Sequence, residues 1–133
     1  MKIKVGINGL GRIGRMALRC IIEKNRKDIE VVAVNNRANS EISSFLLKHD
    51  SIHGELKAKI NHSEKAININ GKKINLTHET EISKINWKKH NVDVVLECTG
   101  KFNTKEKSSQ HIKSGAKKVL VSAPCKGAMN IVF

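Results

Sequence analysis

The ten residues GINGLGRIGR, beginning at Gly6, constrain this chain more than any other feature. They follow a short apolar run and open a segment from Gly11 to Lys24 in which apolar side chains recur at helical spacing. A Gly-x-Gly-x-x-Gly turn between a strand and a helix is typical of dinucleotide-binding folds. There Gly9 permits the tight turn, Gly11 lets a pyrophosphate approach the backbone, and Gly14 lets the helix pack close to the strand.

Arg12 and Arg15 stand in the first turn of the expected helix. The helix dipole disfavours a cation there by roughly 0.3–1 kcal/mol. Phosphates of a bound dinucleotide, held by the unpaired N–H groups of the same turn, would offset that position. The alternative is a structural turn with two solvated arginines.

Strand and helix patterns alternate along the chain. We expect strands at residues 3–8, 29–35, 92–97 and 119–122 and helices at 11–24, 41–48 and 105–113. Such alternation favours parallel βαβ units, so the predicted fold class is α/β, a Rossmann-type, doubly wound, mainly parallel sheet. The last residues, NIVF, are typical of the start of a further strand. Residues 1–133 are therefore expected to form one dinucleotide-binding domain that is incomplete at its carboxyl end.

The segment from Gly54 to about Thr80 has a different period. Two alternating runs in AININGKKINLT flank Asn70-Gly71, a strong β-hairpin signal, so we expect an antiparallel excursion attached to the main sheet. The following KINWKKHN predicts a short helix or turn, in which Trp87 would anchor the hairpin region. Ser40 or Asn39 is available to cap the helix at 41–48.

The end of the second strand reads Asn35-Asn36-Arg37, where a Rossmann unit usually carries an acid that binds the adenosine ribose. Asn36 can still bond a hydroxyl but does not repel a 2′-phosphate, and Arg37 could attract one. The cofactor is therefore NAD or NADP. One hypothesis is that NADP is accepted or preferred, and the alternative is a solvated arginine beside an asparagine that still binds NAD.

Composition narrows the class of protein. The formal charge of +13 suits a polyanion partner, but the lysines are spread along the chain and aromatic residues make up only 3%, so nucleic-acid binding is not favoured. No apolar run approaches the roughly 20 residues that span a membrane, and the amino terminus lacks the apolar stretch of a signal peptide. Three cysteines without paired spacing indicate reduced thiols, a cytoplasmic location and no metal site.

The segments KVGINGLGRIGR, VVAVN, LLKHDSIHGE, NGKKI, ECTGKF and GAKKVLVSAPCKG occur in the order and at the spacing of the phosphorylating glyceraldehyde-3-phosphate dehydrogenases. The chain resembles the amino-terminal cofactor domain of that family over nearly its whole length. Erythrose-4-phosphate dehydrogenase belongs to the same family and remains an alternative. The resemblance implies pyrophosphate contacts at Gly9, Arg12 and Ile13, with Asn8 beside the turn. It places the family's ribose-binding acid at Asn36 and an adenine-side residue that is basic in many members at Thr80, so this sequence departs from the family at both positions. Contacts toward the nicotinamide fall at Thr99, Gly100 and Ser122.

The resemblance also implies what this chain does not hold. The family's nucleophilic cysteine, histidine base and phosphate-binding groups would lie beyond Phe133, so we expect no catalytic residue and no turnover by this chain alone. In a complete enzyme the cysteine thiolate would attack the aldehyde, hydride would pass to the nicotinamide, and phosphate would release the acyl group. The family is tetrameric, which is expected only of the complete enzyme.

The cysteines and histidines present are interpreted as structural. Cys98 is expected to be a small core residue with a thiol pKa raised by Glu97, Cys20 a core residue on the helix face, and Cys125 an exposed, oxidisable loop residue. His49 and His53 flank Asp50 in a connector, where structural hydrogen bonding is favoured over catalysis. The four remaining histidines are interpreted as surface residues: His62, His78, His90 and His111.

Two further functions stay open at this point. One is a related Rossmann enzyme acting on another phosphorylated aldehyde or a semialdehyde. The other is a free-standing dinucleotide-sensing or nucleic-acid-binding module without a catalytic half. If a strand and a helix are missing, the sheet would leave apolar surface bare, and the chain would be marginally stable or prone to associate.

Overall fold

The computed structural model describes residues 2–131. Its elements in chain order are β1 (Ile3–Asn8), α1 (Arg12–Glu23), β2 (Ile29–Asn35), α2 (Ser40–Lys48), β3 (His49–Asp50), β4 (Gly54–Glu55), β5 (Ile60–Ser63), β6 (Ala66–Ile69), β7 (Lys72–Thr77), the 3₁₀ turns η1 (Ile82–Lys84) and η2 (Lys88–His90), β8 (Val94–Glu97), α3 (Lys105–Ser108), α4 (Gln110–Lys113) and β9 (Lys118–Val121). β1 and β2 have the predicted bounds, and β8 and β9 differ from theirs by one or two residues.

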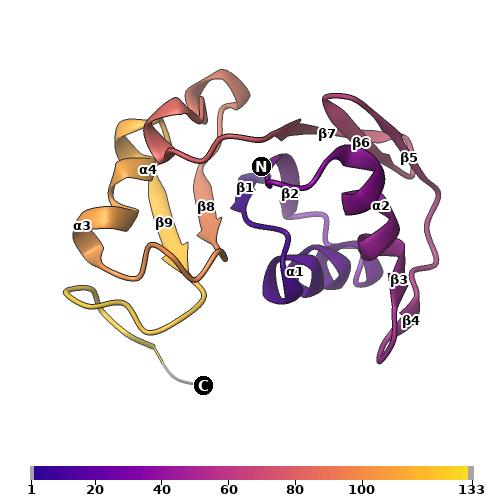
Figure 1. Cartoon of the computed structure of the whole chain (residues 1–133), viewed down its shortest axis with the longest axis horizontal. Coiled ribbons are helices and arrows are strands. Elements are labelled where there is room, and N and C mark those ends of the chain that lie inside the picture. Colours follow the sequence, from indigo (N-terminus) through magenta and orange to yellow (C-terminus); the bar gives the residue numbers. More distant parts are fainter. Residues whose placement is uncertain (1, 132–133) are drawn as a thin grey trace.

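The main sheet has the strand order β5-β6-β7-β2-β1-β8-β9. From β7 to β9 the neighbours run parallel, whereas β5, β6 and β7 are antiparallel. The chain moves outward from β1 to β2 and the hairpin, then returns to β8 on the other side of β1 (Figure 1). Because parallel crossovers are right-handed, this reversal puts α1 and the α3–α4 pair on opposite faces of the sheet. The predicted Rossmann-type α/β fold with an antiparallel excursion is confirmed.

Two buried clusters hold the layers together. One joins Ile7 of β1 to Leu18 of α1 and Leu47 of α2, all three fully buried. The other lies around Trp87 and Val95, with a smaller set of apolar neighbours. Burial of large apolar side chains in both clusters supplies most of the favourable free energy of folding.

The ends of three strands are aligned by a register shift. β1 and β2 slip by one residue between Val5 and Gly6, which leaves one residue of β2 without a partner in β1. The slip brings Asn8, the last residue of β1, level with Asn35 of β2, and Asn8 also pairs with Glu97 of β8. Three buried polar residues therefore end three adjacent parallel strands.

The hairpin and the second helix follow their local signals. Asn70 and Gly71 both have positive φ, 51° and 83°, as a two-residue turn between twisted strands requires. Asn39 caps α2, since its side chain accepts a hydrogen bond from the N–H of Ile42 at 2.9 Å. β7 pairs in parallel with β2, which attaches the hairpin to the sheet as predicted.

Three predictions about packing and helix bounds are wrong. Trp87 does not anchor the hairpin but packs with Val95 in the cluster on the other side of β1. Cys20 is exposed, because the buried side of α1 carries Gly14 and Leu18 instead. The helix expected at residues 105–113 is divided into α3 and α4.

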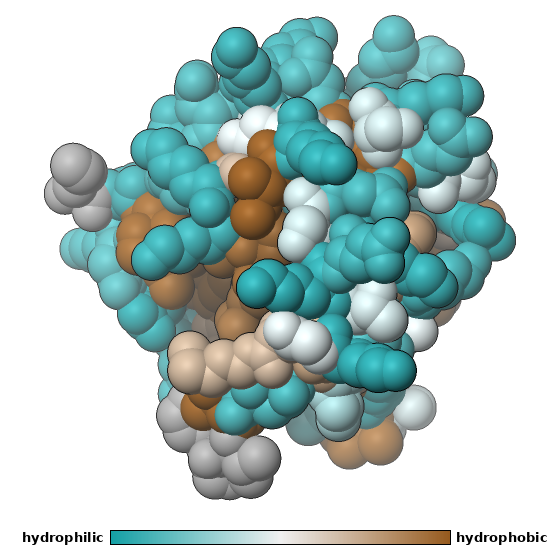
Figure 2. Space-filling view, turned by 90° about the vertical axis from the view of Figure 1, so that its left-hand side faces the viewer, coloured by the Kyte–Doolittle hydropathy of each residue, from teal (hydrophilic) through white to brown (hydrophobic). Residues whose placement is uncertain are grey.

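The carboxyl-terminal side of the sheet carries an apolar surface. Among the strands of residues 2–131, β9 pairs with β8 alone, and the neighbouring side chains of Ile112, Leu120 and Met129 are exposed. Figure 2 shows apolar atoms gathered among hydrophilic ones on this side of the molecule. Asn130 and Ile131 are not in a strand, and the rest of the strand expected at NIVF lies outside the described residues.

We predict that Gly6→Ala destabilises the fold. A Cβ at Gly6 would lie 2.6 Å from Cζ3 of Trp87, so the buried ring must shift, at a cost of about 1–3 kcal/mol. Urea unfolding measures that cost. In a Trp87→Phe background, which lacks this atom, the cost should shrink. An equal cost in both backgrounds would show that the clash is not its origin.

Candidate functional site

A cavity of about 210 Å³ opens at the carboxyl ends of β1, β2 and β8, where the strand order reverses. Among the predicted site residues, those that line it are Asn8, Gly9, Gly11, Asn36, Arg37, Thr80 and Thr99. Those outside its lining are Arg12, Ile13, Gly14, Gly100 and Ser122. Open α/β sheets bind their ligands at such a reversal.

The three glycines of the turn differ in what surrounds them. Gly9 has φ +96°, and a Cβ there would lie 2.9 Å from the Thr99 methyl group. A Cβ on Gly14 would lie 2.0 Å from the carbonyl oxygen of Gly9, so only glycine allows α1 to sit this close to β1. At Gly11 a Cβ would meet nothing within 4 Å, which means that the turn is open to solvent on that side.

The start of α1 keeps its backbone donors available. Gly11 occupies the N-cap position and supplies no side-chain acceptor, and the first turn holds no acidic residue. The first N–H groups of a helix have no partner within the helix. Together with the helix dipole, they can bind an anion at the open side of the turn.

The two arginines of this turn are not simply solvated. Nη1 of Arg12 lies 2.7 Å from Oδ2 of Asp50, and Arg15 donates to the carbonyl oxygen of Leu10 at 3.1 Å. The other carboxylate oxygen of Asp50 accepts the backbone N–H groups of His53 and Ile52, each at 2.8 Å. These N–H groups, His53 first, and the Arg12 charge lower the pKa of Asp50.

The bonds made by Asp50 support the structural interpretation of the connector, in which hydrogen bonding was favoured over catalysis. The group that binds is the Asp50 carboxylate, and it orders the backbone after β3. The ring of His49 packs instead on Phe45, with 4.7 Å between ring centroids. The Arg12 cation in the first turn of α1 is thus paired with the Asp50 carboxylate. The backbone N–H groups of the same turn can therefore bind a second anion.

Asn36 connects the glycine turn to α2. Its Oδ1 accepts the N–H of Leu10 at 3.2 Å, and its Nδ2 donates to Oγ of Ser43 at 3.1 Å. Arg37 is exposed at the cavity and makes no hydrogen bond or ion pair within residues 2–131. The Asn36 amide at the cavity thus makes one hydrogen bond through each of its two polar atoms, whereas the Arg37 guanidinium beside it makes none within residues 2–131.

Beneath the turn, Glu97 is a fully buried carboxylate. Burial alone would raise its pKa, but hydrogen bonds from His111, Thr99 and Asn8 together outweigh burial and hold the pKa below its ordinary value. Next to it, burial raises the pKa of the Cys98 thiol, and the Glu97 charge adds to this, against an opposing hydrogen bond with Ser122. The expectation of an unreactive Cys98 agrees with these surroundings.

Two further predictions about single residues are wrong. His111 is fully buried, with Nε2 2.8 Å from Oε1 of Glu97. Cys125 is buried too, in a loop where the side chain of Asn130 bonds the backbone N–H and C=O of Cys125. Among the other histidines, His90 is half-buried, whereas His62 and His78 are exposed as predicted.

Sequence analysis missed several residues of the cavity lining: Asn35, Glu79, Ile82, Ile85, Cys98, Lys101 and Phe102. It also missed the buried pair beneath the cavity, Glu97 and His111. One signal was available for Glu97, because it ends a continuous apolar run, and such runs are typical of strands buried on both faces of a parallel sheet. For His111 no comparable signal exists, since its segment is polar and its partner lies 14 residues away.

A parallel α/β sheet, a glycine turn leading into an uncapped helix, and a cavity at the reversal of strand order define a Rossmann-type dinucleotide-binding domain. Residues 3–105 match the family described as glyceraldehyde 3-phosphate dehydrogenase, NAD binding domain. The chain belongs to this family, which confirms the resemblance drawn from its sequence motifs.

Curated relatives agree with that assignment. The chain is 47% identical over 128 residues to glyceraldehyde-3-phosphate dehydrogenase of Cereibacter sphaeroides, 44% over 124 residues to that of Thermotoga maritima, and 46% over 125 residues to glyceraldehyde-3-phosphate dehydrogenase 1 of Giardia intestinalis. These alignments cover 93–96% of this chain but only 36–38% of each relative. The chain thus spans somewhat more than a third of the length of the relatives it matches.

Two other kinds of site were sought in the described part of the chain. Within it, no three histidine, cysteine or acidic side chains are grouped as a metal ion would require. Between residues 2 and 131, no helix has the length and apolar character needed to cross a bilayer.

We predict that Glu97 makes folding stability depend on pH. Its folded-state pKa is lowered, so its contribution is present above about 4.5 and is lost as the pH falls through the lower folded value. The difference in unfolding free energy between the wild type and Glu97→Gln should therefore shrink as the medium is acidified. Urea titrations at several pH values measure it, and a constant difference would contradict the assignment.

Proposed function

We propose that this chain binds the nicotinamide dinucleotide for a phosphorylating glyceraldehyde-3-phosphate dehydrogenase. The observation that carries the proposal is the glycine turn, at which a Cβ on Gly11 meets nothing while one on Gly14 meets backbone. A backbone open on one side and closely packed on the other fits a pyrophosphate group. The family match supports the same cofactor class.

The proposed contacts follow the turn and the strand ends. The pyrophosphate would be held by backbone N–H groups near Gly9, Arg12 and Ile13 at the start of α1. The adenosine would lie toward Asn36, Arg37 and Thr80, and the nicotinamide toward Thr99, Gly100 and Ser122. The bound nicotinamide supplies the hydride acceptor. The chain's own residues bind and orient it at the ends of β1, β8 and β9.

The thiol that attacks the aldehyde and the base that assists it are proposed to lie outside these 133 residues. Three observations support this: the relatives are more than twice as long, Cys98 has a raised pKa, and Cys125 is buried. We propose that the apolar surface around β9 receives further sequence of the same protein, and that a tetramer, in the cytoplasm, is a property of the complete enzyme.

We predict saturable binding of NAD or NADP by this chain and no turnover of glyceraldehyde 3-phosphate. Calorimetric titration with each cofactor at two salt concentrations measures the binding. If Arg37 receives a 2′-phosphate, Arg37→Ala should weaken NADP binding about tenfold and leave NAD nearly unchanged. Asn36→Asp should weaken NADP binding as well, since its carboxylate would repel the phosphate. An equal effect on both cofactors would remove the proposed selection.

A matched pair of glycine variants tests the pyrophosphate contact. Gly11→Ala meets no neighbour and should change the unfolding free energy by less than about 1 kcal/mol, yet weaken dinucleotide binding because its methyl group occupies the open side of the turn. Gly14→Ala meets the Gly9 carbonyl and should reduce both stability and binding. Unchanged binding by a folded Gly11→Ala protein would place the pyrophosphate elsewhere.

A further inference from the structure

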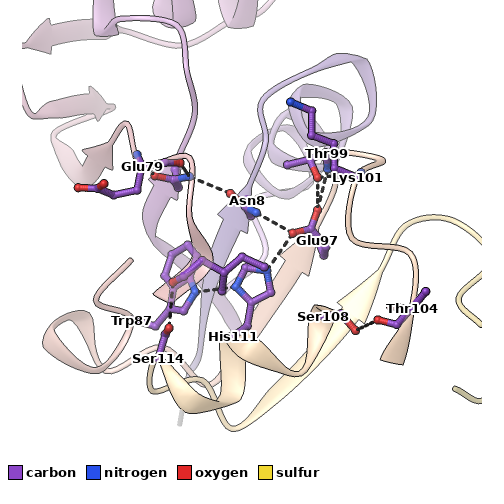
Figure 3. A network of polar contacts seen from close by, with 12 residues as sticks. Asn8, Glu79, Trp87, Glu97, Thr99, Lys101, Thr104, Ser108, His111 and Ser114 are labelled. Atoms are coloured by element: carbon purple, nitrogen blue, oxygen red, sulfur yellow. Dashed lines mark hydrogen bonds and ion pairs between the residues drawn. The ribbon is translucent and has the colours of Figure 1, made fainter. Parts of the chain in front are cut away.

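A continuous row of buried polar side chains runs beneath the cavity, from Trp87 through His111 and Glu97 to Asn8 (Figure 3). The row continues from Asn8 to Asn35. None of the five is more than 4% exposed. Buried polar groups of this kind must each find a partner, because an unmade bond costs about 1–3 kcal/mol. The donor or acceptor character of each atom therefore fixes which group donates and which accepts in every hydrogen bond of the row.

At one end of the row, Trp87 determines the direction of the hydrogen bonds. Its indole Nε1–H can only donate, and it lies 2.9 Å from Nδ1 of His111. Nδ1 must then be the acceptor nitrogen, so the imidazole carries its proton on Nε2. That N–H points at Oε1 of Glu97, 2.8 Å away, which has to accept.

At the other end of the row, the backbone of Glu79 determines the direction of the hydrogen bonds. Oδ1 of Asn35 accepts the N–H of Glu79, and its Nδ2 donates to the carbonyl oxygen of Glu79, both at 2.8 Å, so this amide cannot be flipped. Nδ2 of Asn35 also donates to Oδ1 of Asn8 at 2.9 Å. Nδ2 of Asn8 is thereby turned to Oε1 of Glu97, at 2.6 Å, which again has to accept.

The second oxygen of Glu97 is also only an acceptor. It receives the backbone N–H of Thr99 at 2.9 Å and its hydroxyl at 2.6 Å. Four donors therefore converge on one carboxylate, namely Nε2 of His111, Nδ2 of Asn8, and the backbone N–H and hydroxyl of Thr99. The first three cannot reverse, because Trp87 fixes the imidazole, Asn35 fixes the Asn8 amide, and a backbone N–H only donates. An ionised glutamate satisfies all four, whereas a glutamine would set an NH₂ group against at least one of the three fixed donors.

We propose that Glu97 is a positioning residue that holds Asn8 and Thr99 on either side of the Gly9 turn in the geometry that binds the dinucleotide. Both side chains line the cavity, and the Thr99 methyl group lies against the position of a Cβ on Gly9. This inference rests on the proposed function, because it assigns Glu97 a part in the same site without contact with the ligand. Removing the charge of Glu97 should therefore make the Gly9 turn less ordered.

The test compares Glu97→Gln with Val92→Ala in the full 133-residue chain. Val92 is fully buried in the cluster around Trp87 but lies outside the cavity lining, so its truncation lowers stability and removes no hydrogen bond of the row. We expect Glu97→Gln to weaken NAD binding about tenfold, the size of one lost bond to a charged group. Val92→Ala should lower the melting temperature and change the dissociation constant by less than about twofold. Equal affinities for both variants would overturn the proposal.

Nuclear magnetic resonance spectra of the cofactor-free protein test the positioning role of Glu97 independently of the proposed function. Glu97→Gln should shift the amide resonances of Gly9 and Thr99, and Val92→Ala should leave them in place. That comparison decides the positioning role even if the wild type does not bind NAD, an outcome that would defeat the proposed function alone. If Glu97→Gln does not fold, the ¹⁵N shifts of His111 in the wild type decide: a proton on Nε2 alone supports the directed row, and one on Nδ1 refutes it.

Discussion

The parallel register of β2, β1 and β8 is the constraint on which the rest of the site depends. The one-residue slip after Val5 sets Asn8 beside both Asn35 and Glu97 at the carboxyl ends of the strands. Without the slip, Asn8 would stand opposite an apolar residue of β2, and its amide would lose a partner in a dry environment. The turn at Gly9 follows directly after Asn8, so its position is determined by the register of β1 with β2 and β8.

Charge is arranged around the same turn in two layers. Below it, the Glu97 carboxylate is fully buried and meets donors alone. Beside it, the Asp50 carboxylate binds Arg12 and closes the loop after β3. Both anions are satisfied by the protein, which leaves the N–H groups of the first turn of α1 as the local donors for a ligand. A strongly basic chain can thus present a specific anion site through its backbone rather than through its many lysines.

Local signals predicted most of the fold, since the elements they govern depend on neighbours in sequence. The Asn70-Gly71 turn, a capped start of α2, and the strand and helix on either side of the glycine turn all follow from residue type and spacing. Tertiary contacts account for what sequence analysis missed. His111 is buried by a glutamate on another element, and Cys125 is buried in a loop where the side chain of Asn130 bonds its backbone. Cys20 was wrongly predicted to be in the core, because Gly14 brings another side of α1 close to β1 without giving an apolar signal.

The location of Trp87 gives the protein a built-in optical reporter. The chain contains one tryptophan and no tyrosine, so ultraviolet emission excited above the phenylalanine band arises from a single buried indole. That indole touches Gly6 of the central strand on one side and donates to His111 on the other. Its spectrum therefore reports on the polar row under the cofactor cavity, without any label, from the middle of the sheet.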